Sequence, residues 1–114
     1  MRLEEELRGD AAIVRPYGSL RAGESAEAFE KALGRAEAQV SGAALLDLSN
    51  VREIDSTALG VVVGAGRRLH AAGRELYLVG PNERVLLLFQ LTKLDAVFPV
   101  VPTDEAALSG RGSL

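Results

Sequence analysis

Residues 51–60 read VREIDSTALG and place a cluster of hydroxyl side chains where an apolar strand gives way to a helix. Upstream, residues 44–48 are apolar apart from Asp47, which is typical of a strand covered on both faces. Downstream, apolar side chains recur at helical spacing over residues 59–69. Ser56 is therefore expected at or beside the helix N-terminus, where free N–H groups and the helix dipole favour an oxygen and favour a phosphate still more. We expect the function to lie at this junction.

The remainder of the chain alternates between strand and helix patterns. Leu3 and Leu7 fit a helix face within residues 1–10, and residues 18–23 are expected to form a loop. The expected strands lie at residues 11–17, 44–48, 74–79 and 97–101, and the expected helices at residues 25–38, 56–72, 81–92 and 103–108. Such alternation predicts an α/β fold with a largely parallel sheet, right-handed crossovers and functional loops at the carboxyl ends of strands. The polar residues expected at that end are Asp47, Ser49, Asn50, Asp55 and Ser56.

Capping residues and prolines refine these boundaries. Ser25 and Thr103 are expected to cap the first and last helices, and Pro81 to occupy the first position of the third. Pro16 and Pro99 place their strands near or at an edge of the sheet, because proline cannot donate a ladder hydrogen bond.

Composition narrows the classes of function. The chain has 114 residues, enough for one domain with one core. Thirteen basic against sixteen acidic residues give a formal charge of −3, so no nucleic-acid partner is expected. The absence of cysteine excludes disulfides, thiolate nucleophiles and cysteine-ligated zinc. No apolar run approaches the ~20 residues of a membrane helix, and the N-terminus has no apolar signal region, so we expect a soluble, cytoplasmic protein.

The hydroxyl cluster has no expected catalytic partner. The single histidine, His70, lies fourteen positions beyond Ser56. On one helix that separation is about 21 Å, whereas a general base must come within roughly 3 Å of its target. Glycines in residues 60–66 sit inside a helical pattern, so they indicate a helix backbone lying close against the sheet, not a phosphate-binding loop. The carboxylates near the strand exit are Asp47, Glu53 and Asp55, and because such groups are common without an ion, we expect no metal. Since no histidine, cysteine or cofactor-binding loop is expected near the hydroxyls, we also expect no cofactor and no enzymatic activity.

Several segments carry a resemblance to a known family. Residues 47–51, DLSNV, and residues 54–60, IDSTALG, closely resemble the signature of the STAS domain, in particular that of bacterial anti-sigma factor antagonists. The family's third helix, last strand and terminal helix are resembled by residues 83–95, 98–100 and 103–108. In all, the resemblance covers roughly residues 11–108.

The resemblance implies a definite domain organisation. A single STAS domain would span residues 1–110, followed by a flexible C-terminal tail at residues 111–114. Its fold would be a mostly parallel mixed sheet of about five strands with four helices. The first strand would lie within residues 1–10, in place of the helix face noted above.

The resemblance also implies partner switching in transcription regulation. Ser56 would be phosphorylated by a GHKL-type partner that is both anti-sigma factor and serine kinase. The unphosphorylated chain would bind that kinase and free the sigma factor, and a PP2C-type phosphatase would reset the phosphorylated chain. The chain would act as a monomer or weak dimer, without inserting into a membrane. The implied partner-binding residues are Asp55, Thr57, Ala58, Leu59, Asp47 and Asn50.

Three positions depart from the family pattern. Ala58 and Lys93 stand where glycine is usual, and Arg21 stands where an acidic residue commonly follows residues 18–20. The methyl group of Ala58 would affect how closely the backbone of a kinase can approach Ser56. The charge of Arg21 would affect which partner the chain accepts. Two other functions stay open within the same family: a scaffold subunit of a large signalling assembly, and an accessory subunit of a transport system in which Ser56 is only a helix cap.

Overall fold

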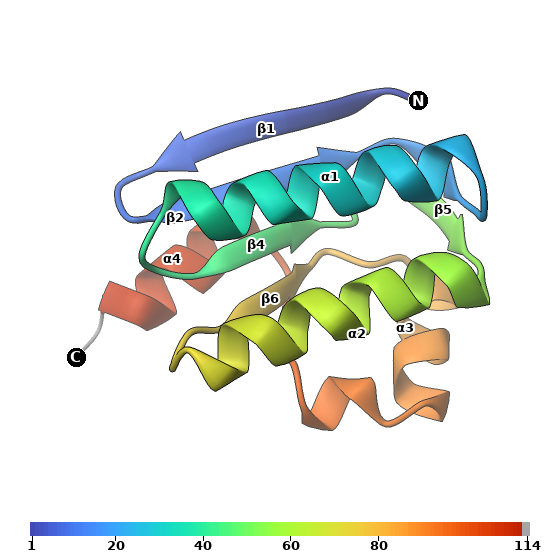
Figure 1. The fold of residues 1–114 in the computed structure, drawn as a ribbon. Coiled ribbons are helices and arrows are strands. Elements are labelled where there is room, and N and C mark those ends of the chain that lie inside the picture. The colour runs from blue at the N-terminus through green and yellow to red at the C-terminus, as the bar shows by residue number, and fades with distance from the viewer. Residues whose placement is uncertain (113–114) are drawn as a thin grey trace.

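The computed structural model describes residues 1–112 of the 114 and shows one α/β domain (Figure 1). The elements in chain order are β1 (Leu3–Arg8), β2 (Ala11–Pro16), β3 (Gly18–Leu20), α1 (Glu24–Gln39), β4 (Ala44–Asp47), β5 (Val51–Ile54), α2 (Ser56–Ala71), β6 (Leu76–Val79), α3 (Glu83–Leu91), the 3₁₀ turn η1 (Leu94–Ala96), β7 (Val100–Val101) and α4 (Asp104–Gly112).

The main sheet has five strands in the order β1-β2-β4-β6-β7. The strand β1 runs antiparallel to β2, and the other neighbours run parallel. The expected mixed, mostly parallel sheet with four helices is therefore confirmed. Residues 3–8 form a strand, as the family resemblance implied, and the helix face suggested by Leu3 and Leu7 is wrong. Pairing with β2 along the whole of β1 outweighs that weak helical spacing.

Helices cover both faces of the sheet. In Figure 1, α1 and α2 run side by side across one face and α4 lies behind the other. Strand periodicity explains the division: Leu46 of β4 faces the α1 and α2 side, whereas Leu45 faces the side that α4 covers. Parallel strands buried on both faces read as apolar runs, which is why residues 44–48 were recognisable.

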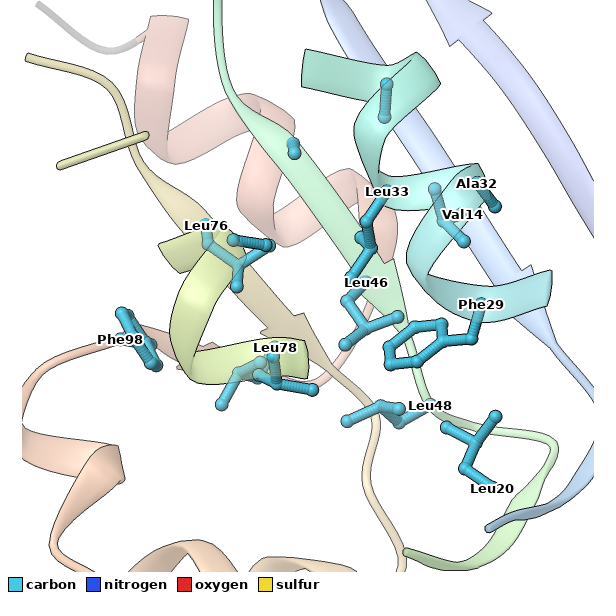
Figure 2. Close-up of a cluster of buried hydrophobic side chains, with 14 of the residues drawn as sticks. Val14, Leu20, Phe29, Ala32, Leu33, Leu46, Leu48, Leu76, Leu78 and Phe98 are labelled. Carbon is cyan, nitrogen blue, oxygen red and sulfur yellow. The ribbon is translucent and has the colours of Figure 1, made fainter. Parts of the chain in front are cut away.

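The larger core lies between the sheet and the pair α1 and α2. Figure 2 shows Phe29 of α1 and Leu46 of β4 turned toward each other, with Leu48 and Leu20 close by. Each of these side chains is almost fully buried. Burying one such side chain contributes about 1.5–3 kcal/mol, so this layer holds α2, and the residues at its start, in a fixed position.

One glycine in α2 is required by packing. A Cβ built on Gly66 would lie 2.3 Å from the ring atoms Cε1 and Cζ of Phe98, so the ring occupies the place of a side chain. The expectation that the glycines let the helix approach the sheet needs correction, because the close neighbour is a ring from the segment before β7. At Gly60 a Cβ would meet nothing within 4 Å.

The segment at residues 18–23, expected as a loop, contains the short strand β3. It pairs in parallel with β5, and the two form a separate two-stranded sheet. Hydrogen bonds extend the pairing at both ends: Gly18 N–H to Asn50 O at 2.9 Å, and Asp55 N–H to Leu20 O at 3.0 Å. The extra strand β5 therefore separates the end of β4 from the start of α2.

Two expected helix starts are wrong by one or two residues. The helix α1 follows Gly23, whose φ of 97° lies in the left-handed region that suits glycine, and the Ser25 hydroxyl instead bonds the backbone of Arg21. The helix α3 follows Asn82, which accepts the N–H of Val85 at 2.8 Å, so Pro81 precedes the cap.

The C-terminal part of the chain also differs from expectation. The last strand comprises Val100–Val101 only, because η1 and the buried Phe98 occupy the preceding residues. It is an edge strand, as Pro99 indicated. The Thr103 hydroxyl accepts the N–H of Ala106 at 3.0 Å, which confirms this cap. The helix α4 is described as far as Gly112, and residues 113 and 114 of the tail expected at 111–114 lie outside the described part. None of the described helices combines the length and apolar character needed to cross a membrane.

Candidate functional site

Asp55 organises the junction between β5 and α2. It is the N-cap of α2, and its Oδ1 atom accepts the N–H of Ala58 at 2.9 Å. Its Oδ2 atom accepts the N–H of Ala22, from the loop before α1, at 2.8 Å. These two N–H groups, in that order, hold the pKa of the Asp55 carboxyl below its ordinary value of 3.8. Asp55 is thus an anion that fixes the first turn of α2 to a neighbouring loop.

Ser56 is the first residue of α2, and it is exposed. Thr57 is exposed beside it, and Leu59 is half-buried. Two hydroxyl side chains therefore stand accessible on the first turn of a helix whose other face is anchored in the core. A buried Ser56 would have removed the basis for any modification of this residue.

Ala58 does not belong to an accessible surface. Its exposure is 0%, and it packs within the larger core beneath the first turn of α2. Ala58 was expected to bind a partner, but its side chain offers no surface for a direct contact in this structure, because the helical period turns position 58 inward when positions 56 and 57 face solvent. The methyl group that replaces the family's usual glycine points away from the surface that carries Ser56.

Asp47 was also expected beside Ser56, but it lies elsewhere in the structure. It is 6% exposed and belongs to the sheet face that α4 covers, opposite the face that carries α2. Its Oδ2 atom binds Arg15 Nε at 3.0 Å, and its Oδ1 atom accepts the N–H and hydroxyl of Ser49. Burial opposes the charge, but the Ser49 and Arg15 donors hold the pKa of Asp47 below its ordinary value. A partner at Ser56 cannot contact this buried carboxylate directly.

Asn50 is exposed but lies at the far end of β5 from Asp55. The five residue steps between Asn50 and Asp55 span about 16 Å of extended chain. The five polar residues expected to meet at one edge therefore lie in two places. Asp55 and Ser56 lie together at the start of α2, whereas Asn50 and Ser49 lie in the turn before β5, where Ser49 bonds the buried Asp47.

An ion network that sequence reasoning missed adjoins Asp55. Glu53 of β5 forms ion pairs with Arg21 of the loop before α1 and with Arg84 of α3, the latter at 3.4 Å. Asn82 reinforces the link between α3 and β5, because its Nδ2 donates to the carbonyls of Val51 and Arg52. Sequence alone could not find these partners, because they come from segments about thirty positions apart.

A groove of about 480 Å³ opens between β5 and α3. Five of its lining residues are apolar, and one of them, Leu91 on α3, is 73% exposed. The spacing of Leu87 and Leu91, one turn apart and off the buried face of α3, was a sequence signal that could have revealed this surface. The lining residues are Arg21, Glu53, Ile54, Asp55, Arg84, Val85, Leu87, Leu88 and Leu91.

The geometry also bears on enzymatic chemistry at the hydroxyls. Ser56 and His70 lie in the first and last turns of the same helix, α2, so they are about 21 Å apart along its axis. His70 instead lies 4.0 Å from Glu75 Oε1. Among residues 1–112, no group of three acidic or histidine side chains is arranged to hold a metal ion. What the site offers is an exposed hydroxyl on a rigid corner, beside a fixed carboxylate and an apolar groove.

Comparisons with known proteins agree with this architecture. The STAS domain family model matches residues 2–107. An anti-sigma-B factor antagonist of Listeria monocytogenes is 40% identical over 55 residues, which are 48% of this chain and 48% of that protein. The chain matches only about half the length of its first curated relatives.

Solved structures match over almost the whole chain. A candidate anti-sigma factor antagonist of Thermotoga maritima superposes with a TM-score of 0.86 at 29% identity, covering 95% of this chain and 92% of that one. An anti-sigma factor antagonist of Mycobacterium paratuberculosis gives a TM-score of 0.80 at 27% identity, covering 96% and 92%.

Proposed function

This chain belongs to the STAS domain family, and on that premise we propose that it is an anti-sigma factor antagonist controlled by phosphorylation of Ser56. Its partner is a GHKL-type anti-sigma factor that is also a serine kinase. The unmodified chain binds this kinase, and the phosphorylated chain is released until a PP2C-type phosphatase removes the phosphate. It acts in the cytoplasm, as a monomer or weak dimer, and has no catalytic turnover of its own.

The observation that carries the proposal is the exposed Ser56 on the first turn of α2. A kinase must reach the hydroxyl oxygen, and the adjacent exposed residue Thr57 leaves room for that approach. The buried side of the same turn, at Ala58, holds the hydroxyl on a fixed platform. Phosphorylation can therefore alter the surface without requiring the core to rearrange.

The chemistry of the modification is a phosphoryl transfer. The Ser56 Oγ atom forms a bond to the γ-phosphorus of ATP held by the kinase, and the bond from that phosphorus to the β-phosphate oxygen breaks. ADP leaves, and a base on the kinase takes the hydroxyl proton. The chain supplies only the acceptor oxygen, which fits the lack of a histidine near Ser56.

The energy of the added charge is sufficient for a switch. Phosphoserine carries about −1.5 to −2 charges at neutral pH. One added charge at ~5 Å from a like charge, at an effective dielectric constant near 20, costs about 3 kcal/mol. That corresponds to about a hundredfold loss of affinity. This cost weakens binding where the like charge belongs to the kinase, because repulsion between the phosphate and Asp55 is present in the free chain as well.

The test is to incubate the protein with ATP and each GHKL-type anti-sigma kinase of the source organism, then to map the phosphorylated peptide. Label is expected on Ser56 in the unmodified protein and in Thr57→Ala, and it should be lost in Ser56→Ala. The Thr57 variant is the matched control, because it removes the neighbouring exposed hydroxyl. Label on Thr57, or no label with any such kinase, contradicts the proposal.

A further inference from the structure

A phosphate on Ser56 would meet a helix terminus at which two N–H donors already serve the carboxylate of Asp55. The N–H of Ala58 is bound by the carboxylate of Asp55, and the N–H of Thr57 also lowers the pKa of that carboxyl. The start of α2 therefore already carries a negative charge directly beside Ser56. The usual stabilisation of a phosphate by a helix N-terminus is weakened here, so a cation from another segment would stabilise the modified chain.

Arg21 is placed to supply that cation. It precedes Ala22, whose N–H binds Asp55 at 2.8 Å, so the backbone of Arg21 is fixed close to the start of α2. Its side chain is 64% exposed, which leaves it free to move. Its charge contributes to the lowered pKa of Asp55, and it lines the same groove as Asp55.

The present partner of Arg21 can release it without being left unpaired. Arg21 pairs with Glu53 through Oε1, while Arg84 lies 3.4 Å from Oε2 of the same carboxylate. When Arg21 moves away, Arg84 still compensates the charge of Glu53. A dianionic phosphate attracts a guanidinium more strongly than one carboxylate does, because it carries more charge and more acceptor oxygens.

We propose that phosphorylation of Ser56 moves Arg21 from Glu53 to the phosphate, so that Arg21 becomes the intramolecular counter-ion of the modified site. Arg84 then holds Glu53 alone. The exchange transmits the phosphorylation state to the groove between β5 and α3, because Arg21, Glu53 and Arg84 all line it. This inference rests on the proposed function for the presence of the phosphate in the cell.

The experiment measures the second pKa of the phosphate by ³¹P NMR, with phosphoserine incorporated at position 56 during translation. The ordinary value is about 6. Arg21→Gln is expected to raise this pKa by about half a unit or more relative to the unsubstituted phosphoprotein, because a nearby cation favours the dianion. Arg21→Lys should keep most of the effect, and added salt should reduce it.

Two further variants separate the proposal from non-specific causes. Arg67→Gln removes the same charge from α2 at eleven positions from Ser56, about 16 Å along the helix and beyond the Debye length, so it should leave the phosphate pKa unchanged. Glu53→Gln should lower the phosphate pKa, because it removes the competitor for Arg21. It also provides the test if Arg21→Gln fails to fold.

The proposal is overturned if neither Arg21→Gln nor Glu53→Gln changes the phosphate pKa relative to Arg67→Gln. The measurement uses no kinase, so it reports on Arg21 whether or not a kinase modifies Ser56. A chain that kinases leave unlabelled but that shows these pKa changes refutes the proposed function alone. A chain labelled at Ser56 with an unchanged phosphate pKa refutes the role of Arg21 alone.

Discussion

The carboxylate of Asp55 accepts the backbone N–H of Ala22 at 2.8 Å and thereby joins the start of α2 to the loop before α1. The same carboxylate caps α2 through Ala58. One side chain thus fixes two segments that sequence places more than thirty positions apart. The Ser56 hydroxyl is held at a defined corner because its immediate neighbour is bonded to both.

This arrangement predicts a pH dependence of stability. The pKa of Asp55 is lower in the folded chain than its ordinary value of 3.8, so its contribution is present above pH 3.8 and is lost as the pH falls through the folded pKa. Asp55→Asn should lower the urea midpoint near pH 7, and the difference from the unsubstituted protein should shrink below pH 3.8. A difference that stays constant with pH contradicts this role.

A pair of glycine substitutions tests the packing of α2. Gly66→Ala should destabilise by about 1–3 kcal/mol, because its Cβ would collide with the ring of Phe98 at 2.3 Å. Gly60→Ala, in the same helix with open space around the new methyl group, should stabilise by about 0.5–1 kcal/mol. Urea unfolding of both variants measures the contrast, and equal effects of the two substitutions contradict it.

Substitution of Ala58 separates stability from partner binding. Ala58→Gly should cost about 1 kcal/mol of unfolding free energy through helix propensity. It should leave kinase affinity unchanged, because the methyl group is 0% exposed. Calorimetric titration with the kinase checks the second part. Tighter binding by Ala58→Gly would mean that position 58 limits the approach of the partner, contrary to its burial.

The ion pairs of Arg15 hold α4 against the sheet, so we expect Arg15 to contribute to stability. Arg15 bonds Asp47 and Asp104, each at 3.0 Å, and burial, together with the charge of Asp47, raises the pKa of Asp104. Arg15→Gln should lower the unfolding free energy by about 2 kcal/mol at neutral pH, which is less than the cost of breaking a fully buried ion pair. This loss of stability should shrink as the pH falls toward the raised pKa of Asp104, because protonation of Asp104 removes the negative charge that Arg15 no longer compensates.

Arg67→Gln is the matched control for Arg15→Gln, because Arg67 is an exposed arginine on the surface of α2. It should change the unfolding free energy by less than about 0.5 kcal/mol. Denaturant unfolding at several pH values compares the two variants. A loss for Arg15→Gln that is as small as this control, or that grows on acidification, would show that the carboxylates do not need Arg15.

The main elements were predictable because their patterns are long or strongly apolar. The sheet and helices around Leu46 and Phe29 follow from periodicity alone. The pair β3 and β5 was not predictable, because three and four residues carry too little pattern and their pairing depends on tertiary contacts.

At the site, sequence located the Ser56 corner but assembled the wrong neighbours. Asp47 and Leu45 share a sheet face by strand periodicity, so the direction of Asp47 could have been inferred. Its contact with Arg15 could not, because that depends on the register of β2 against β4. The same limit hid the contacts of Glu53 with Arg21 and Arg84.

The central claim is that a single phosphate on Ser56 releases the partner. Isothermal titration should compare the unmodified chain with the chain carrying phosphoserine at position 56, each against the anti-sigma kinase that labels it. The phosphorylated chain should bind about a hundredfold more weakly. Equal affinity of the two forms would contradict the switch, whatever the phosphorylation assay had shown.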